Sequence, residues 1–170
     1  MSTTPTLTWH QKIQIEDAIE TVQKLLDSKI LWEGNRPIYQ HAVFIELLIN
    51  LKDLLIKADR LGNRIAFTDG IQENERFGIR DVTDLIGNFR DAACHNDSYR
   101  RKIGDNVSYM NKVFPFNLPV EIRDAPFDGN PNHDIGYEVG GIYLYQRKHI
   151  ERAFSEIKSF FEPIIINWEP

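Results

Sequence analysis

Arg90 and His95 are the two residues whose types and spacing point most directly to chemistry. An arginine side chain is always charged, and its forked N–H donors fit the oxygens of a phosphate group. A histidine has an ordinary pKa close to neutrality, so it can take or give a proton near pH 7. A bound phosphate and a mobile proton are together enough to cleave RNA without a metal ion.

The spacing of these two residues sets a geometric condition on such a site. Five residues along an α-helix correspond to about 7.5 Å of rise and about 140° of rotation, so the two side chains diverge on one regular helix. Either the helix ends near Cys94 and lets His95 turn away, or a second copy of the chain completes the site. The second arrangement predicts an obligate homodimer.

The segment from Arg90 to His95, RDAACH, resembles the Arg-x4-6-His motif of the HEPN superfamily of helical domains. It has four residues between the arginine and the histidine, and a polar residue directly follows the arginine. The resemblance implies a metal-independent endoribonuclease that needs no cofactor and forms a composite site across a homodimer. It also implies a prokaryotic toxin–antitoxin or anti-phage (antiviral) defence context, with an antitoxin or defence protein as a possible partner.

The polar residues around the motif each have two interpretations. Asp91 orients the arginine or the histidine, as the polar residue at this place is thought to do in the family, or it is a surface carboxylate; Asn96 is open in the same way. The basic residues that follow are Arg100, Arg101 and Lys102. Residues 88–102 hold four basic and two acidic residues, a balance of +2 in a chain of −5. This run is either a track for the RNA backbone or an ordinary solvated charge run.

Three other interpretations compete with the ribonuclease. In the first, Arg90 pairs with a neighbouring carboxylate, Asp91 or Asp97, and the histidine caps the helix C-terminus, where a positive charge is favourable. In the second, the chain is a non-catalytic HEPN-like module that binds RNA, a nucleotide or another protein. In the third, His133 and Asp134 lie in an irregular loop and bind a catalytic metal ion, although no spacing in the sequence supports a metal site.

Length and composition place the chain among ordinary soluble proteins. Its 170 residues predict a single domain over residues 1–170, with 42% hydrophobic and 26% charged residues. A net charge of −5 argues against a protein that coats polyanions, though not against a local basic patch. A single cysteine excludes an intramolecular disulfide, and no signal peptide or membrane-spanning run is visible. We expect a cytoplasmic protein.

Apolar periodicity predicts a mainly α fold, a four-to-five-helix HEPN-like bundle. The expected helices run from a Thr8–Gln11 capping box to near Gly34-Asn35, from Pro37 along the stripe Phe44–Ala58, from a cap at Asp81 to about Cys94, and from Tyr143–Gln146 to a stop at Pro163. A short helical segment is expected around Gln72 to Phe77, and Trp9, Leu31 and Trp32 are expected to be packing residues.

A small β-hairpin or sheet is expected before the last helix, as an appendage over about 105–145. Even spacing of apolar residues predicts a strand near 106–114, and the prolines and glycines that follow predict irregular loop over 115–134. Alternation around Gly140-Gly141 predicts a tight hairpin of residues 135–139 with 142–144.

Overall fold

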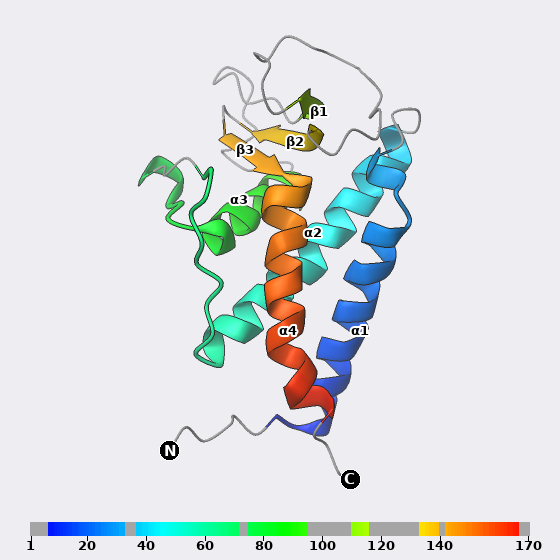
Figure 1. The fold of residues 1–170 in the computed structure, drawn as a ribbon, viewed down its shortest axis with the longest axis vertical. Helices are drawn as coiled ribbons and strands as arrows, with labels where there is room; N and C mark the ends of the chain where they lie inside the picture. Colours follow the sequence, from blue (N-terminus) through cyan, green and yellow to red (C-terminus); the bar gives the residue numbers. More distant parts are fainter. Residues whose placement is uncertain are drawn as a thin grey trace.

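The computed structural model describes residues 7–32, 37–71, 75–94, 110–115, 133–139 and 142–166. The helices are α1 (Trp9–Asp27), α2 (Pro37–Arg60), α3 (Val82–Cys94) and α4 (Arg152–Ile166), and the strands are β1 (Met110–Pro115), β2 (His133–Val139) and β3 (Ile142–Tyr145). A π-helical segment, Gln146–Glu151, leads directly into α4. The described residues are thus mainly helical, with a small antiparallel sheet at one end of the helices, which confirms the predicted class at that level (Figure 1).

Helix α2 is the centre of the bundle, because it packs against α1, α3 and α4. Its predicted stripe is completely buried: Phe44, Leu47, Leu48, Leu51, Leu54, Leu55 and Ala58 are all 0% exposed. Each large apolar side chain removed from water in this way contributes about 1.5–3 kcal/mol. The stripe recurs every three or four residues, so its members lie on one buried face of α2.

Helix α1 begins as predicted and ends earlier than predicted. Gln11 donates its backbone N–H to Oγ1 of Thr8 at 3.3 Å, and Thr8 returns a backbone N–H to Oε1 of Gln11 at 2.8 Å. The helix ends at Asp27 because Lys29 adopts a left-handed backbone, with φ 55°, and a 3-10 turn, Ile30–Trp32, follows. The expected end near residues 34–35 is therefore wrong, although those two residues lie outside the described ranges.

The 3-10 turn after α1 explains the early end of the helix. It buries Leu31, which is 6% exposed, and packs Trp32 against the core, so both are packing residues as predicted. Trp9 is different, because 52% of it is exposed at the start of α1. Trp9 is therefore not part of the core, and its expected role as a packing residue is not confirmed: its position in the first turn places the indole beside His10 at the surface.

The three strands form one antiparallel sheet in the order β1-β2-β3. Pairing of Val139 with Ile142 confirms the predicted hairpin. The predicted loop over 115–134 is wrong at both ends, because Pro115 pairs with His133 and closes the β1–β2 ladder. A proline is tolerated there because β1 lies at the edge of the sheet formed by the described strands. The predicted residues 106–109 of the first strand lie outside the described part of the chain.

One aromatic stack joins the sheet to the bundle. The ring of Tyr137 on β2 lies 3.9 Å from that of Phe44 on α2, at an angle of 21°. Both side chains are fully buried. The sheet is therefore continuous with the helical core.

The last helix begins at Gln146, as predicted, and continues beyond Pro163 to Ile166. The proline removes one N–H donor from the helix, and this is why a stop was expected. Ile164 and Ile165 pack against the core beyond it, and that burial favours one more turn. The predicted stop at Pro163 is therefore wrong.

The connection between α2 and α3 contains a 3-10 turn, Glu75–Phe77, inside the predicted helical segment. Thr83 donates its hydroxyl to the carbonyl of Ile65 at 2.6 Å, and the backbone N–H of Val82 bonds the carbonyl of Phe67 at 3.1 Å. The connection is thus fixed to the first turn of α3. Among the described residues, no helix is both long and apolar enough to cross a bilayer.

Candidate functional site

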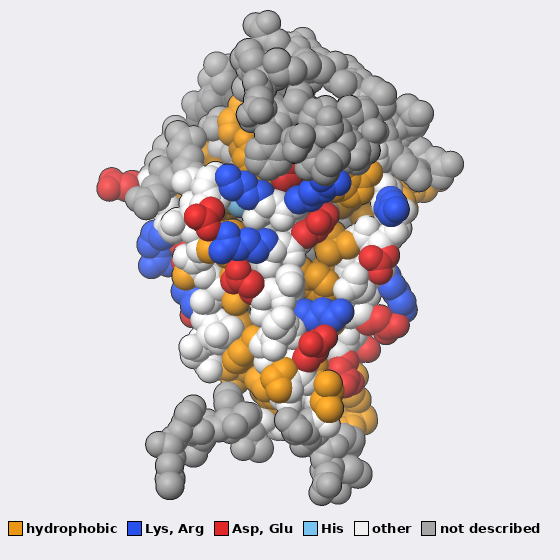
Figure 2. Space-filling view, viewed as in Figure 1, with side chains coloured by type: hydrophobic (Ala, Val, Ile, Leu, Met, Phe, Trp, Pro, Cys, Tyr) orange, Lys and Arg blue, Asp and Glu red, His pale blue; other side chains and the backbone are white. Residues whose placement is uncertain are grey.

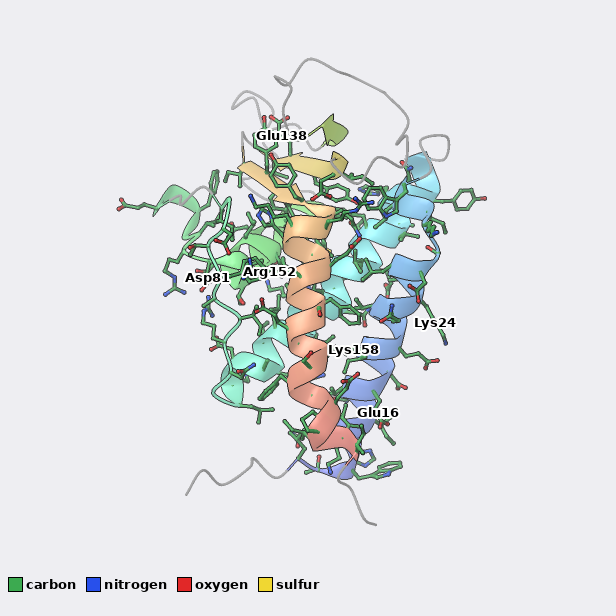
Figure 3. All side chains as sticks on the ribbon, viewed as in Figure 1. Glu16, Lys24, Asp81, Glu138, Arg152 and Lys158 are labelled. Atoms are coloured by element: carbon green, nitrogen blue, oxygen red, sulfur yellow. The ribbon has the colours of Figure 1, made fainter. Side chains whose placement is uncertain are left out.

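The start of α3 is fixed by a predicted cap and by an arginine from the preceding connection. The backbone N–H of Asp84 bonds Oδ1 of Asp81 at 3.0 Å, which confirms Asp81 as the cap (Figure 3). Arg64 reaches Asp81 at 2.8 Å and Asp84 at 2.7 Å. Because the helix starts at a fixed place, the positions of Arg90 and Asp91 further along it are fixed as well.

Helix α3 has one buried face and carries the motif arginine beside that face. Its buried residues include Leu85, Ile86, Phe89, Ala92 and Ala93. The side chains of Arg90 and Asp91 are 32% and 31% exposed. The helix is described as far as Cys94, so the motif arginine lies in the last described turns, with its side chain partly accessible to solvent.

Lys52, Asp91 and Arg90 form an ion cluster that links α2 to α3. Nζ of Lys52 lies 2.9 Å from Oδ1 of Asp91, and Nη1 of Arg90 lies 3.1 Å from the same oxygen. Lys52 crosses α3 at Gly87, where an added Cβ would lie 3.6 Å from its Cε. We call this group the Lys52–Asp91–Arg90 cluster.

The electrostatics of the cluster keep its carboxylate ionised. Burial alone would raise the pKa of Asp91, but the hydrogen bonds from Lys52 and Arg90 outweigh it and bring that pKa below its ordinary value. Lys52 and Arg90 therefore both contact a charged carboxylate oxygen of Asp91.

The structure brings together only part of the predicted site. Arg90 and Asp91 are in contact, as the structural interpretation of the arginine also expected. The remaining predicted residues lie outside the described ranges: His95, Asn96, Asp97, Arg100, Arg101 and Lys102. Lys52 was missed, since it is 39 residues from Asp91 and no local pattern connects them. The only signal available was its place on a flank of α2, beside the apolar stripe.

The predicted location of His133 and Asp134 in a loop is wrong, because both belong to β2. Asp134 is 1% exposed and accepts three backbone N–H groups, from Ile135 at 2.8 Å, Arg147 at 2.9 Å and Lys148 at 3.1 Å. Burial raises the pKa of this carboxyl against the effect of those bonds. Its oxygens hold the N-terminal end of the last helix, which removes the basis for a metal site in a loop.

A buried histidine lies next to this helix start. Nδ1 of His149 accepts the backbone N–H of Tyr145 at 3.1 Å, so the ring proton sits on Nε2, which donates to the carbonyl of Asp69 at 3.2 Å. Burial lowers the pKa of His149 to about 4. This histidine is therefore neutral at pH 7, and its ring joins the backbone of Tyr145 to that of Asp69.

The charged side chains on the described surface are mixed in sign. On the face drawn in Figure 2, basic and acidic side chains of the described residues are interspersed, without a broad area of one sign. Arg152 of α4, for example, is paired with Asp69 at 2.6 Å (Figure 3).

Within the described ranges, no three His, Cys, Asp or Glu side chains are grouped so that they could hold a metal ion. No protein-family model, curated protein or solved structure matches this chain.

Proposed function

We propose that the chain is a metal-independent endoribonuclease of the HEPN type, acting as a homodimer in a prokaryotic toxin–antitoxin or anti-phage defence system. Arg90 binds the scissile phosphate and His95 transfers the proton. The observation that carries the proposal is the placement of Arg90: its guanidinium is one-third exposed near the end of α3 and is held by Asp91.

A guanidinium whose orientation is already fixed is suited to binding a phosphate in the transition state. Donors that are already oriented do not have to reorganise when charge develops on the phosphate oxygens. Asp91 fixes the guanidinium through Nη1, and Lys52 in turn fixes Asp91 from the neighbouring helix. Under the proposal, Asp91 is a supporting residue that orients the arginine, and Lys52 is a positioning residue behind it.

The proposed reaction needs one base, one acid and one phosphate clamp. The ribose 2′-oxygen attacks the adjacent phosphorus, its proton passes to a base, and the bond from phosphorus to the 5′-oxygen breaks as that oxygen takes a proton. His95 serves as the base or the acid, and the second copy of the motif supplies the other role in the composite site. The products are a 2′,3′-cyclic phosphate and a free 5′-hydroxyl.

The remaining motif neighbours complete the proposal. Arg100, Arg101 and Lys102 contact the RNA backbone on either side of the cut, and Asn96 supports the histidine. An antitoxin or a defence protein is the proposed partner in the cell. Binding through phosphate contacts predicts an affinity for RNA that falls as salt rises.

A non-catalytic module that binds RNA, a nucleotide or a protein is the second candidate. The ion pair between Arg90 and Asp91 favours it, because an arginine held by its neighbour also has a sufficient structural role. The two candidates differ in whether RNA is cut.

The test is cleavage of 5′-labelled single-stranded RNA in EDTA by the purified full-length chain. Wild type is compared with His95→Ala, Arg90→Lys and the control His10→Ala, which removes an exposed histidine at the start of α1. We expect wild type and the control to cut equally and to leave cyclic phosphate ends. Loss of a general acid or base predicts a reduction by about 10²–10⁴-fold for His95→Ala.

Two outcomes would contradict the proposal. No cutting over a panel of RNAs by a confirmed dimer, together with RNA binding, would establish the binding module. Equal cutting by wild type and His95→Ala would exclude His95 from the reaction.

A further inference from the structure

An open groove of about 390 Å³ runs between α1 and α4. Each wall is one face of a helix, because the lining residues recur at three- and four-residue spacing. The lining consists of Glu16, Ile19, Glu20, Gln23 and Lys24 on α1, and of Lys158, Glu162, Ile165 and Ile166 on α4. None of the described motif residues belongs to it, so what it binds is independent of the proposed ribonuclease.

The floor of the groove is apolar and reaches the surface at one end. Ile19 and Ile165 are half-buried and pack against the core, whereas Ile166 is 77% exposed. The first turn of α1 lies at the same end of the molecule (Figure 1), and there Trp9 is 52% exposed. Figure 2 shows apolar side chains at this end of the face. Large apolar side chains that gather at the surface are typical of a place where another chain binds.

The charges of the lining leave one carboxylate without a cation. Nζ of Lys24 lies 2.6 Å from Oε1 of Glu20, and Nζ of Lys158 lies 4.0 Å from Oε1 of Glu162. Glu16 has no ion-pair partner among the residues that the structure describes. Three carboxylates and two ammonium groups thus give the lining a net charge of −1.

The unpaired carboxylate lies toward the apolar end of the groove. In Figure 3, Glu16 is nearer the end of the molecule that carries both chain termini, and Lys24 is nearer the sheet. Ile19 is three residues after Glu16, so the two side chains are neighbours on the surface of α1. A lysine or arginine from another chain matches this pair, because its methylene groups can pack on an isoleucine while its charged group reaches a carboxylate.

The shape of the groove fits a third helix. Eight residues separate Glu16 from Lys24, which corresponds to about 12 Å, or about two turns of helix. An amphipathic helix binds in such a groove by placing apolar side chains, at three- and four-residue spacing, between the two helices that form the walls.

We propose that this groove binds an amphipathic helix of a partner protein. Apolar side chains of that helix pack on Ile19, Ile165 and Ile166, and a lysine or arginine pairs with Glu16. The apolar contact supplies most of the affinity, because an exposed ion pair contributes little by itself. The ion pair sets the direction in which the helix lies, since the unpaired carboxylate is at one end of the groove.

The test is fluorescence anisotropy of a labelled peptide mixed with the full-length chain. The probe contains only leucine and lysine, is about four helical turns long and has its leucines at three- and four-residue spacing. A control peptide has the same composition and charge, with its leucines spread around the helix. We expect the amphipathic peptide to bind at least about tenfold more tightly than the control peptide.

The variants are Glu16→Lys and Ile166→Ser, which change exposed side chains and should leave urea unfolding unaltered. Glu75→Lys is the control for charge, because it makes the same change at an exposed residue of the 3-10 turn before α3. Ile49→Ser is the control for the apolar change, because Ile49 is 38% exposed on α2. We expect binding about tenfold weaker in both groove variants and unchanged binding in both controls.

No binding of the amphipathic peptide, equal binding of the two peptides, unchanged affinity in either groove variant, or equal losses in the controls overturns the proposal. A change in the oligomeric state of Ile166→Ser without peptide, measured by sedimentation, would assign the groove to a second copy of the chain and would also overturn it. Each result is independent of RNA cleavage, because no RNA is present in these measurements.

Discussion

Polar side chains in two regions of the molecule differ in their burial and in the groups with which they pair. In the Lys52–Asp91–Arg90 cluster the side chains are about a quarter to a third exposed and pair with one another. At the start of the last helix, Asp134 and His149 are almost fully buried and are balanced by backbone groups. Exposed pairs contribute little stability and leave a guanidinium near solvent, whereas buried groups bonded to the backbone hold the fold. Residue type alone therefore does not identify a functional site.

The largest effect on stability is expected from Asp134→Ala. The change removes the acceptor of three backbone N–H groups, two of which belong to the last helix. We expect a loss of about 3 kcal/mol in the free energy of unfolding, measured with urea. Asp91→Ala is the matched change in the exposed cluster, and it should cost at most about 1 kcal/mol. Equal losses in the two variants would remove the contrast between the two regions.

The next effect is a dependence of stability on pH that comes from His149. Its pKa is about 4 in the folded state and 6.5 when unfolded, so below pH 6.5 the unfolded chain binds a proton that the folded chain does not. The contribution is complete above pH 6.5 and falls by about 2 kcal/mol between pH 6.5 and pH 5. The raised pKa values of Asp134 and Glu151 act in the opposite direction.

Urea unfolding at pH 7.5, 6.5 and 5 measures this effect. His149→Gln, which has no proton to gain, should be less stable at pH 7.5 and should show a flatter profile down to pH 5. A profile in the variant as steep as that of wild type would show that another group is responsible.

The smallest effect on stability, with a measurable effect on activity, is expected from Lys52→Met. Loss of one partly exposed ion pair costs at most about 1 kcal/mol. Under the proposed function, a less firmly held Asp91 lowers RNA cleavage by about tenfold, mainly in kcat, and Lys52→Arg restores it. Lys57→Met is the control, because Lys57 lies on the same helix, is equally buried and pairs with Asp53. A similar loss of activity in both variants would exclude a specific role for Lys52.

Local signals in the sequence predicted much of the fold. The capping box at Thr8, the cap at Asp81 and the apolar stripe of α2 each depend on residues within a few positions of one another, and all three are confirmed. The end of α1 and the effect of Pro163 were predicted wrongly. Both depend on burial against other elements, of Leu31 in one case and of Ile164 and Ile165 in the other.

The candidate site was predictable only in part, for the same reason. The motif arginine and the start of its helix follow from the local pattern, but the link from Lys52 to Asp91 depends on how α2 crosses α3. The buried roles of Asp134 and His149 likewise depend on the sheet meeting the last helix and the α2–α3 connection. Contacts between distant elements carry no periodicity that a sequence can reveal.

The three hydrogen bonds that Asp134 accepts also determine which segments should unfold together. Two of them join β2 to the first turn of the last helix, across 13 and 14 residues, so that turn has its acceptor only while the strand is in place. The hairpin and the beginning of the last helix should then open together, as one cooperative unit. In native-state hydrogen exchange, the amides of Arg147 and Lys148 should share one opening free energy with those of the β2–β3 ladder.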